Sequence, residues 1–309
     1  MKRAARRLLP LFLSGLVAGL AGAGPVQASG LEDALKGLLK EKLGGGDSKQ
    51  ALGTPPQQGD QGKARPESQL LGALLKGETS QEEEVRIGRR IAGNLLGVAP
   101  LVKDQALQQY VNNVGRWISL QSERPGLPWR FGVIESEDIN AFAAPGGYIF
   151  LTKGLYRRLN NEAELAGVLG HEIGHVLRKH HLKLLQQSQA IAALGSLLGG
   201  AMKDEDQLIQ NLIGNGAEVV ARGLDKDAEY EADRIGVVLT ARAGYDTYAL
   251  PAVLADIGHV AKGDKRVSLL FKTHPHPEER LGQLAVAVGS HLDHLPEGQS
   301  VPDRFYRLR

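Results

Sequence analysis

The feature that most constrains this chain is a pair of histidines, His171 and His175, with Glu172 directly after the first. On an α-helix, residues four apart lie on one face, one turn above the other. Both imidazoles can therefore point at a single zinc ion, which binds histidine nitrogen at roughly 2.0–2.1 Å. Glu172 then lies beside the metal, where a carboxylate can accept a proton from an activated water. The pattern H-E-x-x-H thus predicts a metal-binding helix with its own base.

The surrounding residues favour a helix independently of this motif. The apolar residues that recur at helical spacing are Leu165, Val168, Leu169, Ile173, Val176 and Leu177. Asn161 is suited to cap the helix, with Glu162 and Glu164 near its positive end. Gly170 and Gly174 cost roughly 1 kcal/mol each relative to alanine, but allow another backbone or a substrate to come close. The competing interpretation is a core helix that carries the motif by chance.

A catalytic zinc site needs a third protein ligand and an open position for water. His181 stands where the metzincin pattern has its third histidine, but Arg178 replaces the glycine that breaks the helix in that pattern. On a continuous helix, His181 lies about 240° from His175 and cannot reach the same ion. A better source is the segment 225–236, which predicts a second helix capped by Asp225 or Asp227.

Two glutamates of this second helix compete for the role of ligand. Glu229 shares a face with Asp233, four residues later, and the small residues Ala232 and Gly236 flank that face. This helix can therefore pack close to the metal helix. Glu231 points about 200° away from Glu229, and helical geometry alone does not choose between them. A solvated, charged helix end is the third interpretation of this run.

The N-terminal residues predict export. Residues 1–28 contain no acid, and their basic residues are Lys2, Arg3, Arg6 and Arg7. A short apolar stretch follows, then small residues before Ser29, as in a cleavable secretory signal. An uncleaved anchor is the alternative. The formal net charge of the chain is +2, so the remainder carries −2 without the +4 of this leader. The charge therefore gives no case for binding nucleic acid.

Composition and local pattern divide the chain into segments. The 309 residues include no cysteine, which excludes disulfides, thiolate ligands and a lipid-modified cysteine, so a lipoprotein is not expected. Residues 29–79 combine a short amphipathic helix at 31–43 with a flexible linker at 44–68 that is rich in Gly, Gln and Pro. We expect a globular domain at 80–290 and a C-terminal tail at 291–309.

Two helices are expected at the start of the globular domain. Ser80 and Glu83 form a capping box for a helix over residues 80–96. Asp104 is suited to cap the next helix, which ends before Pro125. The apolar face of that second helix is expected to hold Leu107, Val111, Val114, Trp117 and Ile118.

A small sheet is expected between these helices and the metal helix. Residues 129–134 and 148–152 favour strands, and Pro145, Gly146 and Gly147 mark a turn before the second of them. A strand beside the metal helix can offer its edge to an extended peptide; a core hairpin without a ligand is the alternative. Residues 190–201, rich in Ala, Leu and Gly, favour a core helix or a flap and are too few to span a bilayer.

Four landmarks in this order make the sequence similar to a known family. They are His171–His175, Glu229–Asp233, the segment Asn140–Thr152, and Thr273–Pro275 with Arg280. The chain resembles the HtpX, BepA and LoiP type of zinc metallopeptidase. These are gluzincins, related to the CAAX prenyl protease and the mitochondrial Oma peptidase. The resemblance covers about residues 80–290 and leaves out the leader, the linker and the C-terminal tail.

The resemblance implies roles for particular residues. Glu229 would be the third zinc ligand, and Asp233 would bind a ligand histidine through its carboxylate. His274 and Arg280 would lie near the site. His274 would cap the open zinc position in a resting enzyme or donate to the oxyanion, unless it belongs to a surface loop. The substrate-binding edge strand would comprise Gly147, Tyr148, Ile149 and Phe150.

The chain departs from this family after the second histidine. Many relatives carry arginine and then histidine four and five residues after it, whereas this chain has Lys179 and His180, with His181 in addition. The role of the pair stays open, and the run 178–181 is equally compatible with a solvated helix end. We assign no role to His259, His291 or His294.

Together these observations predict an α+β, mainly α, zincin-like domain that binds one Zn²⁺ and hydrolyses peptide bonds. Glu172 would be the catalytic base. The resemblance implies a periplasmic quality-control peptidase acting on unfolded or misassembled outer-membrane or envelope proteins. A metal-binding chaperone or scaffold with gated or little proteolysis is the main alternative. The base beside the metal argues against a pure scaffold. A peptidase of short peptides is the second alternative.

Overall fold

The computed structural model describes the residues 79–187, 224–260, 264–268, 270–292 and 297–308. The chain divides into two units, residues 1–62 and 63–309, and every described residue belongs to the second unit. The expected leader, the helix at 31–43, the linker at 44–68 and the segment 190–201 lie outside the described residues. None of the described helices has both the length and the apolar character needed to cross a bilayer.

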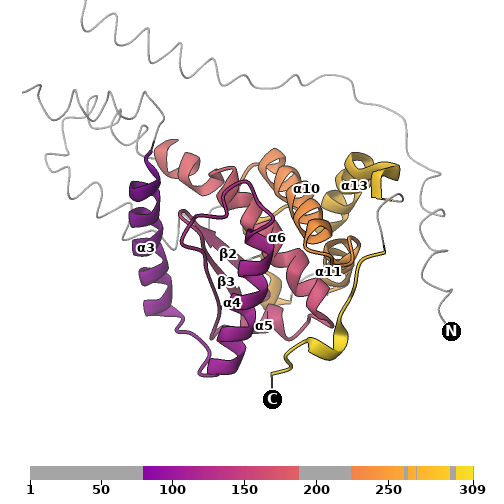
Figure 1. The fold of residues 1–309 in the computed structure, drawn as a ribbon, viewed down its shortest axis with the longest axis horizontal. Helices are drawn as coiled ribbons and strands as arrows, with labels where there is room; N and C mark the ends of the chain where they lie inside the picture. Colours follow the sequence, from indigo (N-terminus) through magenta and orange to yellow (C-terminus); the bar gives the residue numbers. More distant parts are fainter. Residues whose placement is uncertain (1–78, 188–223, 261–263, 269, 293–296, 309) are drawn as a thin grey trace, which may run out of the picture. The chain divides into compact units, whose positions relative to one another are not determined.

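The described residues form a mainly helical domain with a small mixed sheet, which confirms the expected α+β class (Figure 1). The strands are β1 (Arg130–Ile134), β2 (Ala141–Ala144) and β3 (Tyr148–Thr152). Their order in the sheet is β1-β3-β2, so β3 is the middle strand. It pairs parallel with β1 and antiparallel with β2.

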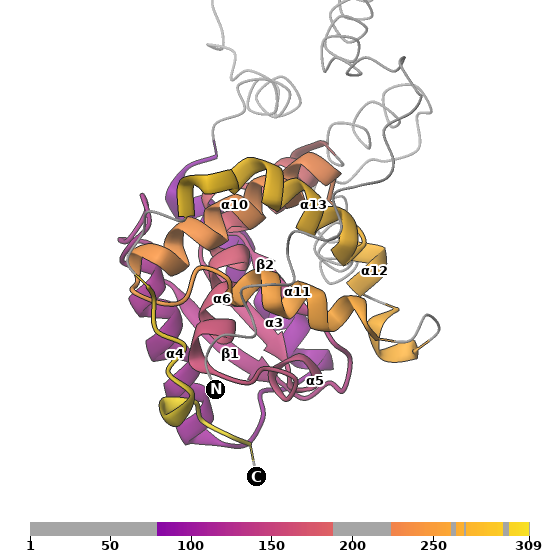
Figure 2. The ribbon, with the colours of Figure 1, turned by 90° about the vertical axis from the view of Figure 1, so that its right-hand side faces the viewer.

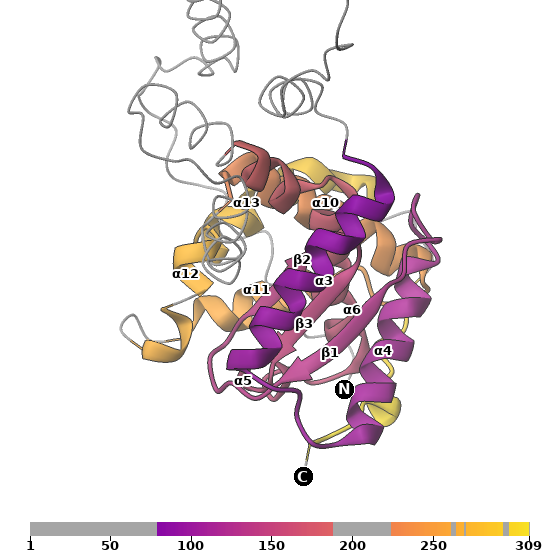
Figure 3. The same cartoon turned by 90° about the vertical axis from the view of Figure 1, so that its left-hand side faces the viewer.

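Alternate side chains of a strand point to opposite faces of the sheet. Both faces of this sheet are buried, each in a different hydrophobic cluster. Ala143, Ile149 and Leu151 join a core with α4 (Gln105–Ser119) and α6 (Glu162–Leu177). Phe142, Ala144 and Phe150 join a second cluster with α3 (Gln81–Val98). The sheet therefore lies between α3 on one face and α4 with α6 on the other (Figure 3).

The predicted helix starts are confirmed by their caps. The side chains of Ser80, Asp104 and Asn161 each accept a hydrogen bond from the backbone N–H three residues later, at 3.2, 3.0 and 2.9 Å. Trp117, expected on the apolar face of α4, is not buried with the others. Its side chain is half exposed, and its indole nitrogen donates to the carbonyl oxygen of Ala243 at 3.0 Å.

The helix α10 (Lys226–Arg242), capped by Asp225, runs against α6 at very short range. A Cβ atom added at Gly236 would lie 2.8 Å from the backbone nitrogen of His171. One added at Gly170 would lie 2.9 Å from the carbonyl oxygen of Gly236. The close packing expected from these small residues is therefore confirmed, and it is a contact between the two backbones themselves.

Among the described residues, three α-helices follow α10 along the chain (Figure 2). They are α11 (Ala249–Gly258), α12 (Leu270–Thr273) and α13 (Pro277–Val288). A short helix, α5 (Lys153–Tyr156), follows β3 directly. The single-turn 3₁₀ segments are η2 (Lys265–Val267), η3 (Gly289–Leu292) and η4 (Pro302–Arg304).

The C-terminal residues, expected to form a tail, pack against the start of α6. Phe305 is buried and stacks on Tyr156 with ring centres 5.2 Å apart. Arg304 donates to the buried carboxylate of Glu162, the first residue of α6. Tyr110 and Tyr245 donate to the same carboxylate at 2.9 and 2.7 Å. Burial raises the pKa of Glu162, but the hydrogen bonds from these donors lower it by a larger amount. The pKa of Glu162 therefore lies below its usual value.

Replacing Gly236 with alanine should destabilise the protein, although alanine favours a helix. The new methyl group would overlap the backbone of α6, and overpacking of this kind costs about 1–3 kcal/mol. Gly93→Ala is the matched control, because nothing lies within 4 Å of a Cβ atom there. That variant should gain about 0.5–1 kcal/mol from helix propensity. Urea unfolding of metal-free protein measures both. Equal stabilisation by the two changes would contradict the close contact.

Glu162→Gln should reduce stability in a pH-dependent way. The lowered pKa of Glu162 means that its charge stabilises the fold above the unfolded-state value of about 4.3. This contribution is lost as pH falls through the lower folded-state pKa, where the protonated carboxyl resembles an amide. The difference in unfolding free energy between wild type and variant should therefore be largest near neutral pH and shrink in acid. A constant difference across this range would contradict the assignment.

Candidate metal centre

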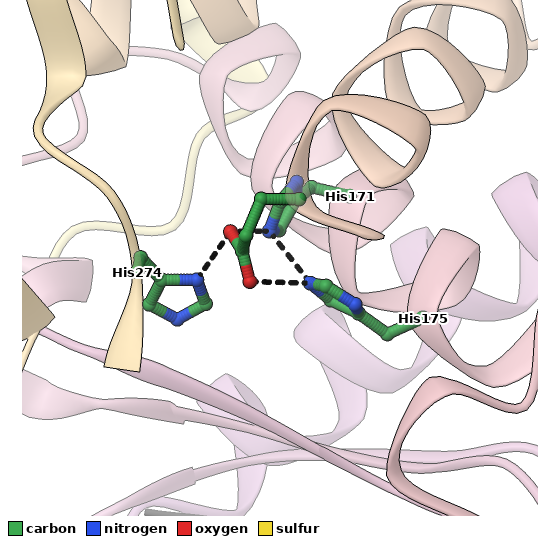
Figure 4. A group of neighbouring side chains, drawn as sticks. His171, His175 and His274 are labelled. Atoms are coloured by element: carbon green, nitrogen blue, oxygen red, sulfur yellow. Dashed lines mark hydrogen bonds and ion pairs between the residues drawn. The ribbon is translucent and has the colours of Figure 1, made fainter. Parts of the chain in front are cut away.

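The helix α6 presents two histidines to one point. His171 and His175 are both buried, and their Nε2 atoms face each other at 3.0 Å. The two rings stand nearly perpendicular, with an interplanar angle of 89°. Figure 4 shows these imidazoles converging on the same place as that of His274. The spacing of four residues thus produces the convergence that the sequence predicts.

The helix α10 brings Glu229, and not Glu231, to these nitrogens. The carboxylate of Glu229 is completely buried. Its oxygens lie 3.7 Å from Nε2 of His171 and 3.5 Å from Nε2 of His175. Glu231 is partly exposed and pairs with Arg178 at 2.9 Å. Of the two competing glutamates, the structure therefore places Glu229 at the candidate site.

The segment between α12 and α13 adds His274. Its Nδ1 lies 2.7 Å from Oε2 of Glu229. The potential ligand atoms of His171, His175, Glu229 and His274 all lie within 4.8 Å of one another. His274 is therefore part of the candidate centre and does not belong to a surface loop.

The electrostatics of this group fit a bound cation. Within the part of the chain that the structure describes, Oε1 of Glu229 is buried and has no hydrogen-bond partner, so its lone pairs are unsatisfied. Burial raises the pKa of Glu229, but His274 and Arg280 lower it to about 2, so the carboxylate is charged. Burial, reinforced by the neighbouring histidines, lowers the pKa of His175 well below its usual value. A neutral imidazole and a charged carboxylate are both ligand types that zinc binds.

Asp233 and Arg280 support the first histidine from behind. Nδ1 of His171 lies 2.9 Å from Oδ1 of Asp233. Arg280 donates to both oxygens of Asp233, at 2.6 and 2.9 Å, and is itself buried. Burial raises the pKa of Asp233, but Arg280 and His171 lower it by a larger amount. The pKa of Asp233 therefore falls well below its usual range. Both residues therefore lie at the site, as the resemblance implies.

Glu172 faces a small cavity beside the four residues of the candidate metal centre. The cavity is lined by Ala141, Phe142, Ala143, Glu172, His181, Leu224, Glu229, Thr273 and His274. Glu172 is buried, and this burial raises its pKa, an effect to which the charge of Glu229 adds. Nearby His171 acts in the opposite direction without reversing the shift. A carboxylate with a raised pKa is a stronger base than an ordinary glutamate.

The prediction that β3 provides the substrate-binding edge is wrong. Gly147, Tyr148, Ile149 and Phe150 belong to the middle of the sheet or its approach, with β1 and β2 on either side. β2 is the edge strand that lines the cavity, and within the described ranges no strand pairs with its outer side. Periodicity identifies a strand but does not give its neighbours, because pairing depends on residues far apart in sequence.

The interpretation of the run 178–181 as a solvated helix end is also wrong. Lys179 adopts a left-handed φ of 57°, which ends α6 and turns the chain, and residues 180–187 are helical again. His180 and His181 are both buried as a result. The ring centre of His181 lies 5.6 Å from that of His175, beside the four candidate ligands. The sequence signal for this second helix is the spacing of Leu182 and Leu185, which lie three residues apart and are both buried.

Comparison with known proteins places these residues in a family. The model for peptidase family M48 matches residues 103–287. The beta-barrel assembly-enhancing protease of Escherichia coli (strain K12) is 33% identical over 219 residues, which cover 68% of this chain and 45% of that protein. The metalloprotease YcaL of the same organism is 30% identical over 166 residues, covering 53% and 64%. The mitochondrial metalloendopeptidase OMA1 of Arabidopsis thaliana is 28% identical over 188 residues, covering 60% and 37%. The chain thus spans less than half the length of the first of these relatives.

Replacing Glu229 with alanine should abolish stoichiometric zinc binding, because it removes the charged donor of the group. Asp227→Ala is the matched control, since Asp227 is exposed in the first turn of the same helix. Metal analysis of the purified proteins after dialysis against trace zinc measures the difference. Retention of zinc by the Glu229 variant would show that this carboxylate is not a ligand.

Proposed function

Because the chain belongs to peptidase family M48, we propose that it is an exported zinc endopeptidase. The observation that carries this proposal is the position of Glu172. Its buried carboxylate shares one cavity with Glu229 and His274. A base, a set of metal donors and a strand edge that is unpaired within the described residues are the parts that hydrolysis of a peptide bond requires. The chain spans less than half the length of its first relatives, so peptidase activity of the whole protein is also proposed.

Zinc would be held by His171, His175 and Glu229. A bound zinc ion supplies Lewis acidity, which polarises a carbonyl and lowers the pKa of water to about 7. The two imidazoles contribute neutral nitrogen and the glutamate contributes the negative charge. Zinc is proposed over other divalent ions because two imidazoles with one carboxylate form a common catalytic zinc set.

Glu172 would move the proton during the reaction. With its pKa raised by burial, it accepts a proton from the attacking water and returns it to the amine that leaves. Asp233 and Arg280 act on His171, because Asp233 accepts from its Nδ1 and Arg280 holds Asp233 in place. The contacts of each side chain in the site support these proposed roles.

The substrate would bind as an extended strand along β2. Thr152 donates its backbone N–H to the carbonyl of Asn140 at 3.0 Å, which makes this pair hydrogen-bonded. Because such pairs alternate in an antiparallel ladder, Ala141 and Ala143 direct their peptide groups away from β3. These groups can pair with an added strand, and the same residues line the cavity of Glu172.

A gated site is the second candidate, and His274 is the observation that favours it. Its ring joins two histidines and a glutamate, and four protein donors around one zinc leave no position for water. In a resting enzyme His274 would therefore hold the site closed. Displaced from the metal, it would remain close enough to donate to the oxyanion. A scaffold with little proteolysis would keep the closed arrangement.

The proposed substrates are unfolded or misassembled proteins of the bacterial envelope. The support is the similarity to a protein named beta-barrel assembly-enhancing protease, together with the secretory leader that the sequence predicts at residues 1–28. An extended substrate on β2 would require locally unfolded chain, which matches a role in quality control. The periplasm is the compartment that such a leader and such substrates imply.

Glu172→Gln should retain zinc and lose proteolysis. The amide keeps the size of the side chain but cannot accept the proton, and such transfer contributes about 10²–10⁴-fold. Residues 29–309 of wild type and variant are compared for bound zinc and for cleavage of an unfolded protein such as casein. Glu164→Gln is the control, because Glu164 lies in the first turn of the same helix.

Two other outcomes have defined meanings. Equal cleavage by both proteins would exclude Glu172 as the base. Zinc in both proteins without cleavage by either would favour the gated candidate. His274→Ala should then release activity, and continued inactivity of that variant would favour a scaffold.

A further inference from the structure

The two proposed histidine ligands are held from behind in different ways. His171 meets the carboxylate of Asp233 at 2.9 Å through Nδ1. Among the described residues, no carboxylate holds the equivalent position at His175. Its Nδ1 lies instead 2.9 Å from Nδ1 of His180. A ligand histidine needs a partner on its remote nitrogen, because that contact fixes both the tautomer and the ring orientation.

The turn at Lys179 is what brings His180 to this position. With a left-handed φ of 57°, Lys179 ends α6 and directs the following residue back toward the metal helix. His180 is buried, and its ring lies 5.2 Å from that of His175 at an interplanar angle of 70°. A straight continuation of α6 would not make this contact, because residues five apart lie on different faces.

The contacts continue from His180 to the protein surface. Nε2 of His180 lies 3.2 Å from Oε2 of Glu231. Oε1 of Glu231 pairs with Nε of Arg178 at 2.9 Å, and Arg178 also donates to Glu123 at 2.7 Å. Glu231, the glutamate that does not reach the candidate metal centre, is therefore tied to it through two histidines.

A single assignment of donors and acceptors satisfies the hydrogen bonds from His175 through His180 to Glu231. Nε2 of His175 faces His171 and Glu229, so it is the nitrogen available to the metal. Its Nδ1 must then carry the proton and donate to Nδ1 of His180. His180 carries its own proton on Nε2, which donates to Glu231. The carboxylate accepts at the end of the series, and Arg178 balances its charge.

We propose that His180 and Glu231 are positioning residues for the second zinc ligand. They hold His175 in the tautomer and orientation that present Nε2 to the metal, and Glu231 strengthens that donor through the two hydrogen bonds. This inference rests on the proposed zinc-binding role of His175. It assigns a shared task to the residues that follow the motif and to the second glutamate of α10.

The test measures zinc affinity and does not depend on catalysis. The full chain is prepared as wild type, His180→Phe, His180→Asn and Glu231→Gln, and each dissociation constant for zinc is obtained by competition with a chromophoric chelator. Phenylalanine keeps a ring but cannot accept a hydrogen bond. Asparagine restores an acceptor close to the position of Nδ1. His259→Phe is the control, because among the described residues the ring of His259 bonds the carbonyl of Ala255 in the adjoining helix α11, far in sequence from the candidate ligands.

His180→Phe should bind zinc about 10–100-fold more weakly, the usual effect of losing such a partner. His180→Asn should recover part of this loss. Glu231→Gln should show a smaller loss, since the amide can still accept. His259→Phe should match the wild type. Substitution with Co²⁺ provides a second readout, because the visible spectrum should change in His180→Phe as the geometry of His175 relaxes.

Wild-type affinity and an unchanged cobalt spectrum in His180→Phe would overturn the inference while leaving the proposed zinc site intact. Absence of zinc from the wild type would instead overturn the proposed function, and this inference with it. A purely structural role predicts that the thermal midpoint of metal-free His180→Phe falls while its zinc affinity does not. Glu231→Gln guards against misfolding, because its side chain is partly exposed and its substitution is conservative.

Discussion

The candidate centre depends on one contact, the direct approach of the α10 backbone to the α6 backbone at Gly170 and Gly236. A larger residue at either position would hold the helices apart. Because the helices touch here, Glu229 and Asp233 reach the histidines of α6 from a segment more than fifty residues later. Hydrogen bonds and metal ligation act only over short distances. The glycines at 170 and 236 allow this short distance between the helices, and the arrangement of the site depends on them.

That contact also sets the charge balance of the interior. It buries the carboxylates of Glu229 and Asp233 against α6, with Glu172 nearby. Buried carboxylates are costly unless they are paired. Arg280 neutralises Asp233 with two hydrogen bonds, whereas Oε1 of Glu229 has no hydrogen-bond donor. A cation held by Glu229 would therefore stabilise the fold, and metal binding would be coupled to folding at this centre.

The sequence predicted what is encoded locally. Helix starts follow from the caps Ser80, Asp104 and Asn161, and the convergence of His171 and His175 follows from the pitch of one helix. The close packing of α10 against α6 is also predictable from the sequence, because the small residues Ala232 and Gly236 flank the face that carries Glu229. The edge strand was missed since the position of β3 depends on its distant partner β1. The burial of His180 was missed because it requires a left-handed residue, and Lys179 is a type that rarely adopts this conformation.

The packing of the C-terminal residues has a consequence for the order of events during synthesis. Glu162 opens the metal helix, and its buried charge is satisfied partly by Arg304, while Phe305 covers the adjacent core. A ribosome releases α6 long before it releases these residues. Until they emerge, the start of α6 has an incompletely paired carboxylate and uncovered apolar surface. The helix that would perform hydrolysis therefore reaches its final packing late, after the rest of the domain has already been translated.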